Sequence, residues 1–199
     1  MKIDVRVDQA YLNNAYKALR SIPGAFPRAV AAASNRTLET MRTDTVRETK
    51  ERYFAKPGDI RKTITLKKAS VGNLSGVMLS RGTRKNLTKY QVTPKSPQAG
   101  RKKGFMGAVK REGGLKPLPK GTFMINTPNA GPVLFVRTSS GKWGIKHVHS
   151  PSIPQIIKNK ETVDAVETHA QKVFIERLCL FYFFVSTLLT IVQIIYNIK

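Results

Sequence analysis

Histidine is the residue type that most often does chemistry near neutral pH, and two of the three histidines in this sequence are close neighbours. His147 and His149 lie one residue apart, so on a β-strand their imidazoles share a face. Two imidazoles supply half of the ligands that a structural zinc ion takes. No cysteine or carboxylate lies nearby in sequence to complete the set, and His169 is distant. We therefore expect a surface or loop pair and no metal site.

The common active-site motifs do not occur in the chain. G-x-S-x-G, H-E-x-x-H, the P-loop and G-x-G-x-x-G are all absent. Gly113-Gly114 is followed by Leu-Lys-Pro, which is typical of a turn rather than of a phosphate-binding loop. The 12 Asp and Glu residues lie mostly on predicted helices among basic residues, where ion pairing explains them. The sequence predicts no catalytic residue and no cofactor.

Positive charge is the outlying property of the composition. The 199 residues include 35 Lys and Arg against 12 Asp and Glu, a formal net charge of +23. Such a surplus attracts anionic partners, whether nucleic acid, an anionic membrane or an acidic protein surface. The densest region is 81–120, with twelve basic residues and one acid, Glu112. A basic interaction surface is predicted at Arg81, Arg84, Lys85, Lys89, Lys95, Arg101, Lys102, Lys103, Lys110 and Arg111.

Contact of this surface with nucleic acid is expected to be independent of base sequence. Tyr90 and Phe105 are the main aromatic residues nearby, too few for a base-stacking platform. No recognition-helix or zinc-finger pattern offers sequence readout. Binding would rest on phosphate contacts and weaken steeply with salt. A non-specific nucleic-acid-binding protein is therefore one hypothesis for function.

The elements that position these residues follow from hydrophobic periodicity. Residues 2–7 alternate between apolar and polar, which predicts a half-buried strand, and Asp8 is placed to cap the helix after it. Glycine and proline mark the ends of the helices. The expected helices cover about 9–21 and 25–54, one turn at 59–62, a start near Pro154, and a terminal helix from about 161.

Residues 63–148 differ in composition from the helical segments before them. Short runs of strand-forming residues alternate there with Gly, Pro, Asn and Ser, which predicts antiparallel pairing. Residues 94–104, rich in Pro, Gly and Lys, are expected to form a mobile basic loop. The predicted fold is α+β: an N-terminal strand and two helices packed on a small antiparallel β-sheet or sandwich, then a C-terminal helix. The expected strands are 63–66, 74–79, 87–92, 105–109, 121–125, 133–136 and 143–145.

Several segments resemble, in their sequence pattern, the segments of one known protein family. They are KIDVRVDQAYLNNAYKAL at 2–19, AFPRAVAAASNRTLETMRTDTVRE at 25–48, Tyr53-Phe54 leading into PGDIRKTITLKKAS at 57–70, NLSGVMLSRG at 73–82, and FVRTSSGKWGIKHVHSPSIPQIIKN at 135–159. With these segments, residues 1–175 resemble the phage minor tail protein Z family, the tail-completion proteins of long-tailed phages and prophages. The last segment, a Gly/Lys hairpin leading into Pro-Ser-Ile-Pro-Gln, is the most specific.

The resemblance implies a structural virion protein, not an enzyme, assembled in the cytoplasm of the bacterial host. Such a protein completes the tail at its head-proximal end and enables the joining of head and tail. Its implied partners are further copies of itself in a ring around the tail axis and other tail and neck proteins, with non-specific DNA contact as a neighbouring interaction. The family brings no cofactor and no catalytic residue to this sequence.

The end of the chain departs from the family pattern, whose members finish with a charged amphipathic helix. Residues 178–198 contain no charged residue and lie between Arg177 and Lys199. About 20 apolar residues in a helix span the core of a bilayer, so a membrane segment is a third hypothesis for function, that of a tail-anchored membrane protein. The candidate membrane positions are Leu178, Phe181, Phe184, Leu188, Ile191 and Ile195.

Three interpretations of this segment are open. It is a membrane anchor, a buried or oligomer-packed helix, or the product of a change of reading frame after about Arg177. The predicted organisation is a tail-completion-like α+β domain over 1–176, followed by the apolar segment 177–199. Cys179 is the single cysteine, so the chain forms no intramolecular disulfide.

Overall fold

The computed structural model describes residues 2–3, 9–19, 22, 24–97, 104–129, 131–139 and 144–197. The chain divides into two compact units, and each draws on separate stretches of sequence. The helical unit comprises Met1–Thr45, Ile64–Leu79 and Lys160–Lys199. The strand-rich unit comprises Val46–Thr63 and Ser80–Asn159.

The helices are α1 (Gln9–Leu19), α2 (Ala25–Arg52), α3 (Pro57–Thr63), α4 (Ile153–Ile157) and α5 (Lys160–Asn197), with a 3-10 helix, η1 (Leu87–Lys89). The strands are β1 (Lys2–Ile3), β2 (Ile64–Lys67), β3 (Val77–Ser80), β4 (Arg84–Asn86), β5 (Gln91–Thr93), β6 (Met106–Ala108), β7 (Lys116–Pro117), β8 (Thr122–Thr127), β9 (Gly131–Arg137), β10 (Ile145–His147) and β11 (His149–Ser152).

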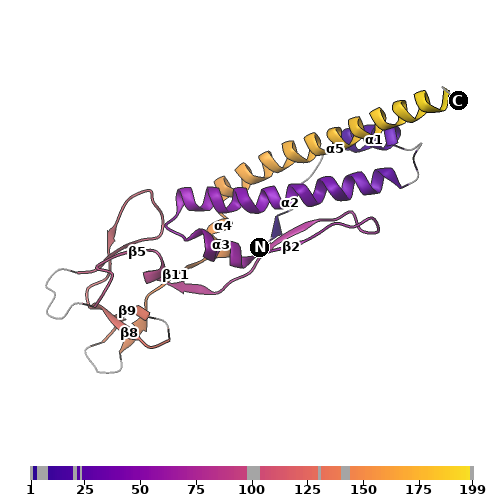
Figure 1. The fold of residues 1–199 in the computed structure, drawn as a ribbon. Helices are drawn as coiled ribbons and strands as arrows, with labels where there is room; N and C mark the ends of the chain where they lie inside the picture. The colour runs from indigo at the N-terminus through magenta and orange to yellow at the C-terminus, as the bar shows by residue number, and fades with distance from the viewer. Residues whose placement is uncertain are drawn as a thin grey trace. The chain divides into compact units, whose positions relative to one another are not determined.

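Apolar side chains of α1, α2 and α5 form the core of the helical unit, in which the three helices lie side by side (Figure 1). On α5 the buried positions recur every fourth residue, so one face of the helix is turned to the core. On α2 the core positions are mostly alanine, whose small side chain lets the helices approach closely. The core residues are Leu19, Ala25, Ala29, Val30, Ala33, Phe174 and Leu178.

A small sheet of order β1–β3–β2 completes the helical unit. Residue Asn35 of α2 holds the chain just after β2 through two hydrogen bonds to Ala69. Its Nδ2 donates to the Ala69 carbonyl at 3.0 Å, and its Oδ1 accepts the Ala69 N–H at 2.8 Å. One amide side chain thus satisfies both backbone groups of a residue outside any strand.

The strand-rich unit contains three small antiparallel sheets: β10–β9–β8, β5–β6–β7 and β11–β4. The longest pairing is the β8–β9 hairpin, which runs from Thr122 opposite Val136 to Thr127 opposite Gly131. A second apolar core lies in this unit, and β5, β8 and β9 each contribute one side chain to it. The core residues are Leu87, Val92, Phe105, Met124 and Leu134.

The α+β class is confirmed, as are the helices predicted in the first 63 residues and after Pro154. The prediction of a strand over 87–92 is wrong in its first half, where the chain forms η1 before β5 begins at Gln91. Strands β4, β7 and β11 are not predicted from sequence, because all three are short and β7 and β11 contain proline. Residues 4–8, most of the predicted basic loop (98–103) and Trp143 lie outside the described residues.

Candidate functional site

The strand-rich unit carries most of the positive charge of the protein. Its sequence holds 22 Lys and Arg against 4 Asp and Glu, a net charge of +18 out of the +23 of the whole chain. The helical unit holds the other 13 basic and 8 acidic residues. Charge is thus concentrated in the unit of short strands and loops, which contains every residue of the predicted basic interaction surface.

The predicted basic residues are distributed around the small sheets. Arg84 and Lys85 lie on β4 and Lys89 lies in η1. Arg81 follows β3, Lys95 follows β5, and the Lys110–Arg111 pair follows β6. The side chains of Arg101, Lys102 and Lys103 lie outside the described residues.

A cavity of about 400 Å³ brings three of these residues together with two lysines that sequence reasoning missed. We call it the cationic cavity. Its basic lining residues are Lys50, Lys56, Lys89, Lys95 and Arg111. No Asp or Glu lines it, and none of the five forms an ion pair with a carboxylate among the described residues. Lys50 and Lys56 lie far from 81–120 in sequence, and no sequence signal joins them to it.

Arg111 is fixed in the wall of this cavity by the end of helix α2. The backbone after α2 pairs with the backbone after β6, since Phe54 N–H donates to Val109 O and Arg111 N–H donates to Arg52 O, both at 2.9 Å. The Arg111 Nε then donates to the Lys50 carbonyl at 2.9 Å. A guanidinium at a helix C-terminus satisfies a free carbonyl and interacts favourably with the helix dipole.

Aromatic and apolar side chains form most of the remaining lining, and Thr88 and Gln91 are its uncharged polar residues. The Arg111 guanidinium lies 4.7 Å from the centre of the Phe54 ring, a cation–π arrangement. The Tyr90 hydroxyl donates to the Pro151 carbonyl at 3.2 Å. Burial raises the pKa of the Tyr90 phenol, against a smaller lowering by its hydrogen bond with Ser150, so the phenol stays neutral near pH 7. Val92 and Met124 line the cavity and are buried.

The two neighbouring histidines lie on successive strands and stack on each other. The ring centres of His147 on β10 and His149 on β11 are 4.2 Å apart, and Phe135 meets the His147 ring edge-on. Burial, and then the charge of His149, lowers the pKa of His147. Within the part of the chain that the structure describes, no three His, Cys, Asp or Glu side chains gather as metal ligands would.

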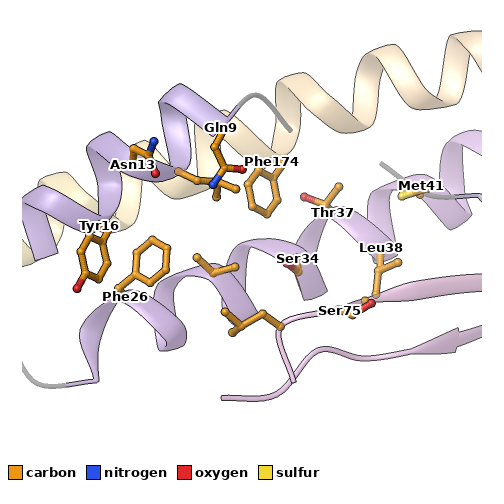
Figure 2. A pocket seen from close by; sticks show the side chains of 14 residues that line it. Gln9, Asn13, Tyr16, Phe26, Ser34, Thr37, Leu38, Met41, Ser75 and Phe174 are labelled. Carbon is orange, nitrogen blue, oxygen red and sulfur yellow. The ribbon is translucent and has the colours of Figure 1, made fainter. Parts of the chain in front are cut away.

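A second cavity, of about 580 Å³, lies in the helical unit and was not predicted from sequence (Figure 2). Tyr16 on α1, Phe26 and Leu38 on α2, and Phe174 on α5 supply its apolar lining. Polar side chains of Gln9, Asn13, Ser34, Thr37 and Ser75 also line it. The mixed lining contains no charged residue, and Tyr16 is its titratable side chain.

A family described as prophage minor tail protein Z matches residues 11–178 of the chain. The protein belongs to this family. The resemblance predicted for residues 1–175 is therefore confirmed over nearly all of that range. No curated protein and no solved structure matches the chain. As a prophage minor tail protein, it is a component of the phage tail, where it interacts with other tail proteins.

The match to the minor tail protein Z family stops at Leu178, where the uncharged segment begins. Helix α5 nevertheless continues without a break to Asn197. Leu178 is buried in the core of the helical unit and Phe181 packs partly against it, whereas Leu180 and Phe183 are 59% and 71% exposed. The side chains of Phe184, Leu188, Ile191 and Ile195 lie outside the described residues. Among the residues that were described, no helix is long and apolar enough to cross a membrane.

Proposed function

We propose that the protein completes the tail at its head-proximal end and enables the joining of tail to head, acting by assembly and not by catalysis. The observation that carries this proposal is the family match over residues 11–178, together with the tail-completion segments that run from Lys2 to Asn159. The proposed partners are further copies of the chain, arranged as a ring around the tail axis, and the proteins of the tail and neck.

The charge of the chain constrains such a ring. Copies that each carry +23 repel one another, so a ring gains stability when an anionic neighbour lies against the strand-rich unit. The helical unit, with a net charge of +5, is better suited to contact a second copy. We therefore assign contacts between copies to the helical unit and contacts with anionic partners to the strand-rich unit.

Deletion of the gene from a phage that encodes this chain tests the proposal. We expect electron microscopy of the lysate to show filled heads and tails of normal length that do not join, and purified protein added to the lysate to restore infectious particles. Joined, infectious particles in the absence of the protein would overturn the proposal.

Immunogold labelling of intact virions places the protein independently. Gold at the head–tail junction supports the proposal, and gold at the distal tip contradicts it. Mass spectrometry of purified virions should also detect the protein at the copy number of about one ring, and its absence from finished particles would contradict a structural role.

A further inference from the structure

We propose that the cationic cavity of the strand-rich unit is a binding site for the phosphodiester groups of nucleic acid. The inference concerns the purified chain and does not rest on the role in head–tail joining. It assigns a site, and residues to it, where the composition of the chain gave only a general affinity for anions.

The first argument is the convergence of positive charge on one concave surface. Lys50, Lys56, Lys89, Lys95 and Arg111 come from five separate elements or loops and line the same cavity. No acidic side chain lines it. Like charges held close together repel, and all five side chains are exposed, so an anion from solvent can reach them. A bound phosphate group relieves the repulsion.

The second argument is that the fold holds the Arg111 side chain, and the backbone of Lys50 and Lys89, in place before any ligand binds. The Arg111 Nε donates to the Lys50 carbonyl, and the guanidinium lies over the Phe54 ring. Its other N–H groups can donate to a ligand. Lys50 lies in the last turn of α2 and Lys89 in η1, both regular elements. A site that is already formed loses less entropy on binding than one that orders with its ligand.

The third argument concerns the kind of anion. The cavity of about 400 Å³ is larger than a single phosphate group, and its lining includes Phe54, Tyr90, Val92 and Met124. A nucleotide unit offers both a phosphate for the lysines and an apolar or aromatic face for these side chains. A carboxylate side chain of a protein uses the charge of the cavity but little of its apolar lining.

The fourth argument is the charge around the cavity. The strand-rich unit carries +18, far more than five residues supply, and Arg84, Lys85 and Lys110 are further cations of the same unit. A long polyanion gains from all of this charge, because each phosphate that is neutralised releases counterions. The combination of a formed cavity and a broadly basic unit therefore favours nucleic acid over a short acidic peptide.

Fluorescence anisotropy of labelled random-sequence DNA, single-stranded and duplex, titrated with the full chain over a salt series tests the proposal. The double variant Lys56→Ala, Lys89→Ala removes two exposed charges from the cavity. The matched control, Lys116→Ala, Lys120→Ala, removes two exposed charges of the same unit that do not line it. We expect the cavity variant to bind roughly tenfold more weakly, with a log–log salt slope shallower by about 1.8 for duplex DNA and about 1.4 for single-stranded DNA, and the control to change much less.

Equal losses in the two double variants would overturn the proposal, because they would show that net charge and not the cavity determines binding. Lys95→Glu gives an independent second test, since a reversed charge in the cavity should weaken binding further than Lys120→Glu outside it. Polyglutamate at a matched concentration of charge serves as a competitor. If it displaces DNA as well as unlabelled DNA does, the site takes an acidic protein segment, and the assignment to nucleic acid is wrong.

Discussion

The Nδ1 atom of His169 lies 2.6 Å from Oδ2 of Asp44, so a hydrogen bond joins helices α5 and α2 across 125 residues of sequence. The Asp44 side chain is only 5% exposed, whereas that of His169 is 45% exposed. A carboxylate this deeply buried is costly unless it is hydrogen-bonded. The contact therefore fixes how α5 lies along α2 within the helical unit.

Substitution of His169 by alanine is expected to lower the free energy of unfolding by about 1–3 kcal/mol, because a buried carboxylate oxygen loses a partner. Urea denaturation of the full chain measures the change. Lys172→Ala, an exposed residue one turn further along α5, is the matched control and should change stability by less than about 0.5 kcal/mol. A double variant with Asp44→Asn should lose less than the sum of the single losses. Additive losses would contradict the coupling of the two side chains.

His147 is expected to make the folded protein less stable as the pH falls below neutral. Its pKa in the folded chain lies below the usual 6.5, because Nδ1 is buried without a hydrogen-bond partner among the described residues and because His149 is close. Between that lowered pKa and 6.5 the unfolded chain binds more protons than the folded chain, so stability rises with pH. Acidification from about pH 7 to about pH 5 therefore removes stability.

Substitution of His147 by asparagine should flatten this dependence, as measured by urea midpoints at several pH values between those limits. His149→Asn is the paired control. It removes the neighbouring charge, which is the smaller cause of the lowered pKa, and should flatten the dependence less. A dependence on pH that is unchanged in the His147 variant would show that the stability loss comes from other groups.

Gly121 precedes β8 with a φ angle of +81°, and its carbonyl accepts the Arg137 N–H at 3.2 Å, next to the first pair of the β8–β9 hairpin. A side chain in this left-handed region costs about 1–2 kcal/mol. We expect Gly121→Ala to lower the free energy of unfolding by that amount, as measured by thermal unfolding. Gly58→Ala in α3 is the control, since no atom lies within 4 Å of its added Cβ, and it should be neutral or stabilising by up to about 1 kcal/mol. Equal effects of both substitutions would contradict the conformational explanation.

The sequence predicted the helices well because their boundaries have local causes. Gly24 lies just before α2, and Pro154 falls in the first turn of α4, where proline is tolerated. The strands were harder to predict. Residues 87–92 were predicted as one strand, but Leu87 lies in the second core with Phe105 and Leu134, and the chain forms η1 over Leu87–Lys89. Tertiary packing therefore outweighed the local strand propensity of these residues.

The cationic cavity was predictable only in part. The excess of basic residues over 81–120 is plain in the sequence, and Lys89, Lys95 and Arg111 come from it. Lys50 and Lys56 join them only because the chain after α2 pairs with the chain after β6. A long-range pairing of three residues has no signature in a single sequence, so the cavity required the structure.

Truncations at the apolar end of α5 can separate the three interpretations of the C-terminal segment. Leu178 is buried and Phe181 packs against the same core, so the first turn after Arg177 belongs to the fold. Leu180 and Phe183 face away from that core and are exposed. Truncations on either side of this turn can therefore distinguish the part of α5 that stabilises the helical unit from the part that does not.

A chain ending at Tyr182 is expected to unfold at the same temperature as the full chain, because it keeps Leu178 and Phe181. A chain ending at Arg177 should lose on the order of 2–5 kcal/mol, since a buried leucine is removed from the core. Thermal unfolding measures both, and equal stability of the two truncations would contradict the packing of Leu178.

Comparison of the full chain with the one ending at Tyr182 then decides the role of residues 183–199. If the truncated chain no longer co-sediments with membranes, the segment is an anchor. If it no longer forms oligomers in analytical ultracentrifugation, the segment is a helix packed between copies. If it behaves as the full chain does and still joins heads to tails, the tail protein does not use the segment.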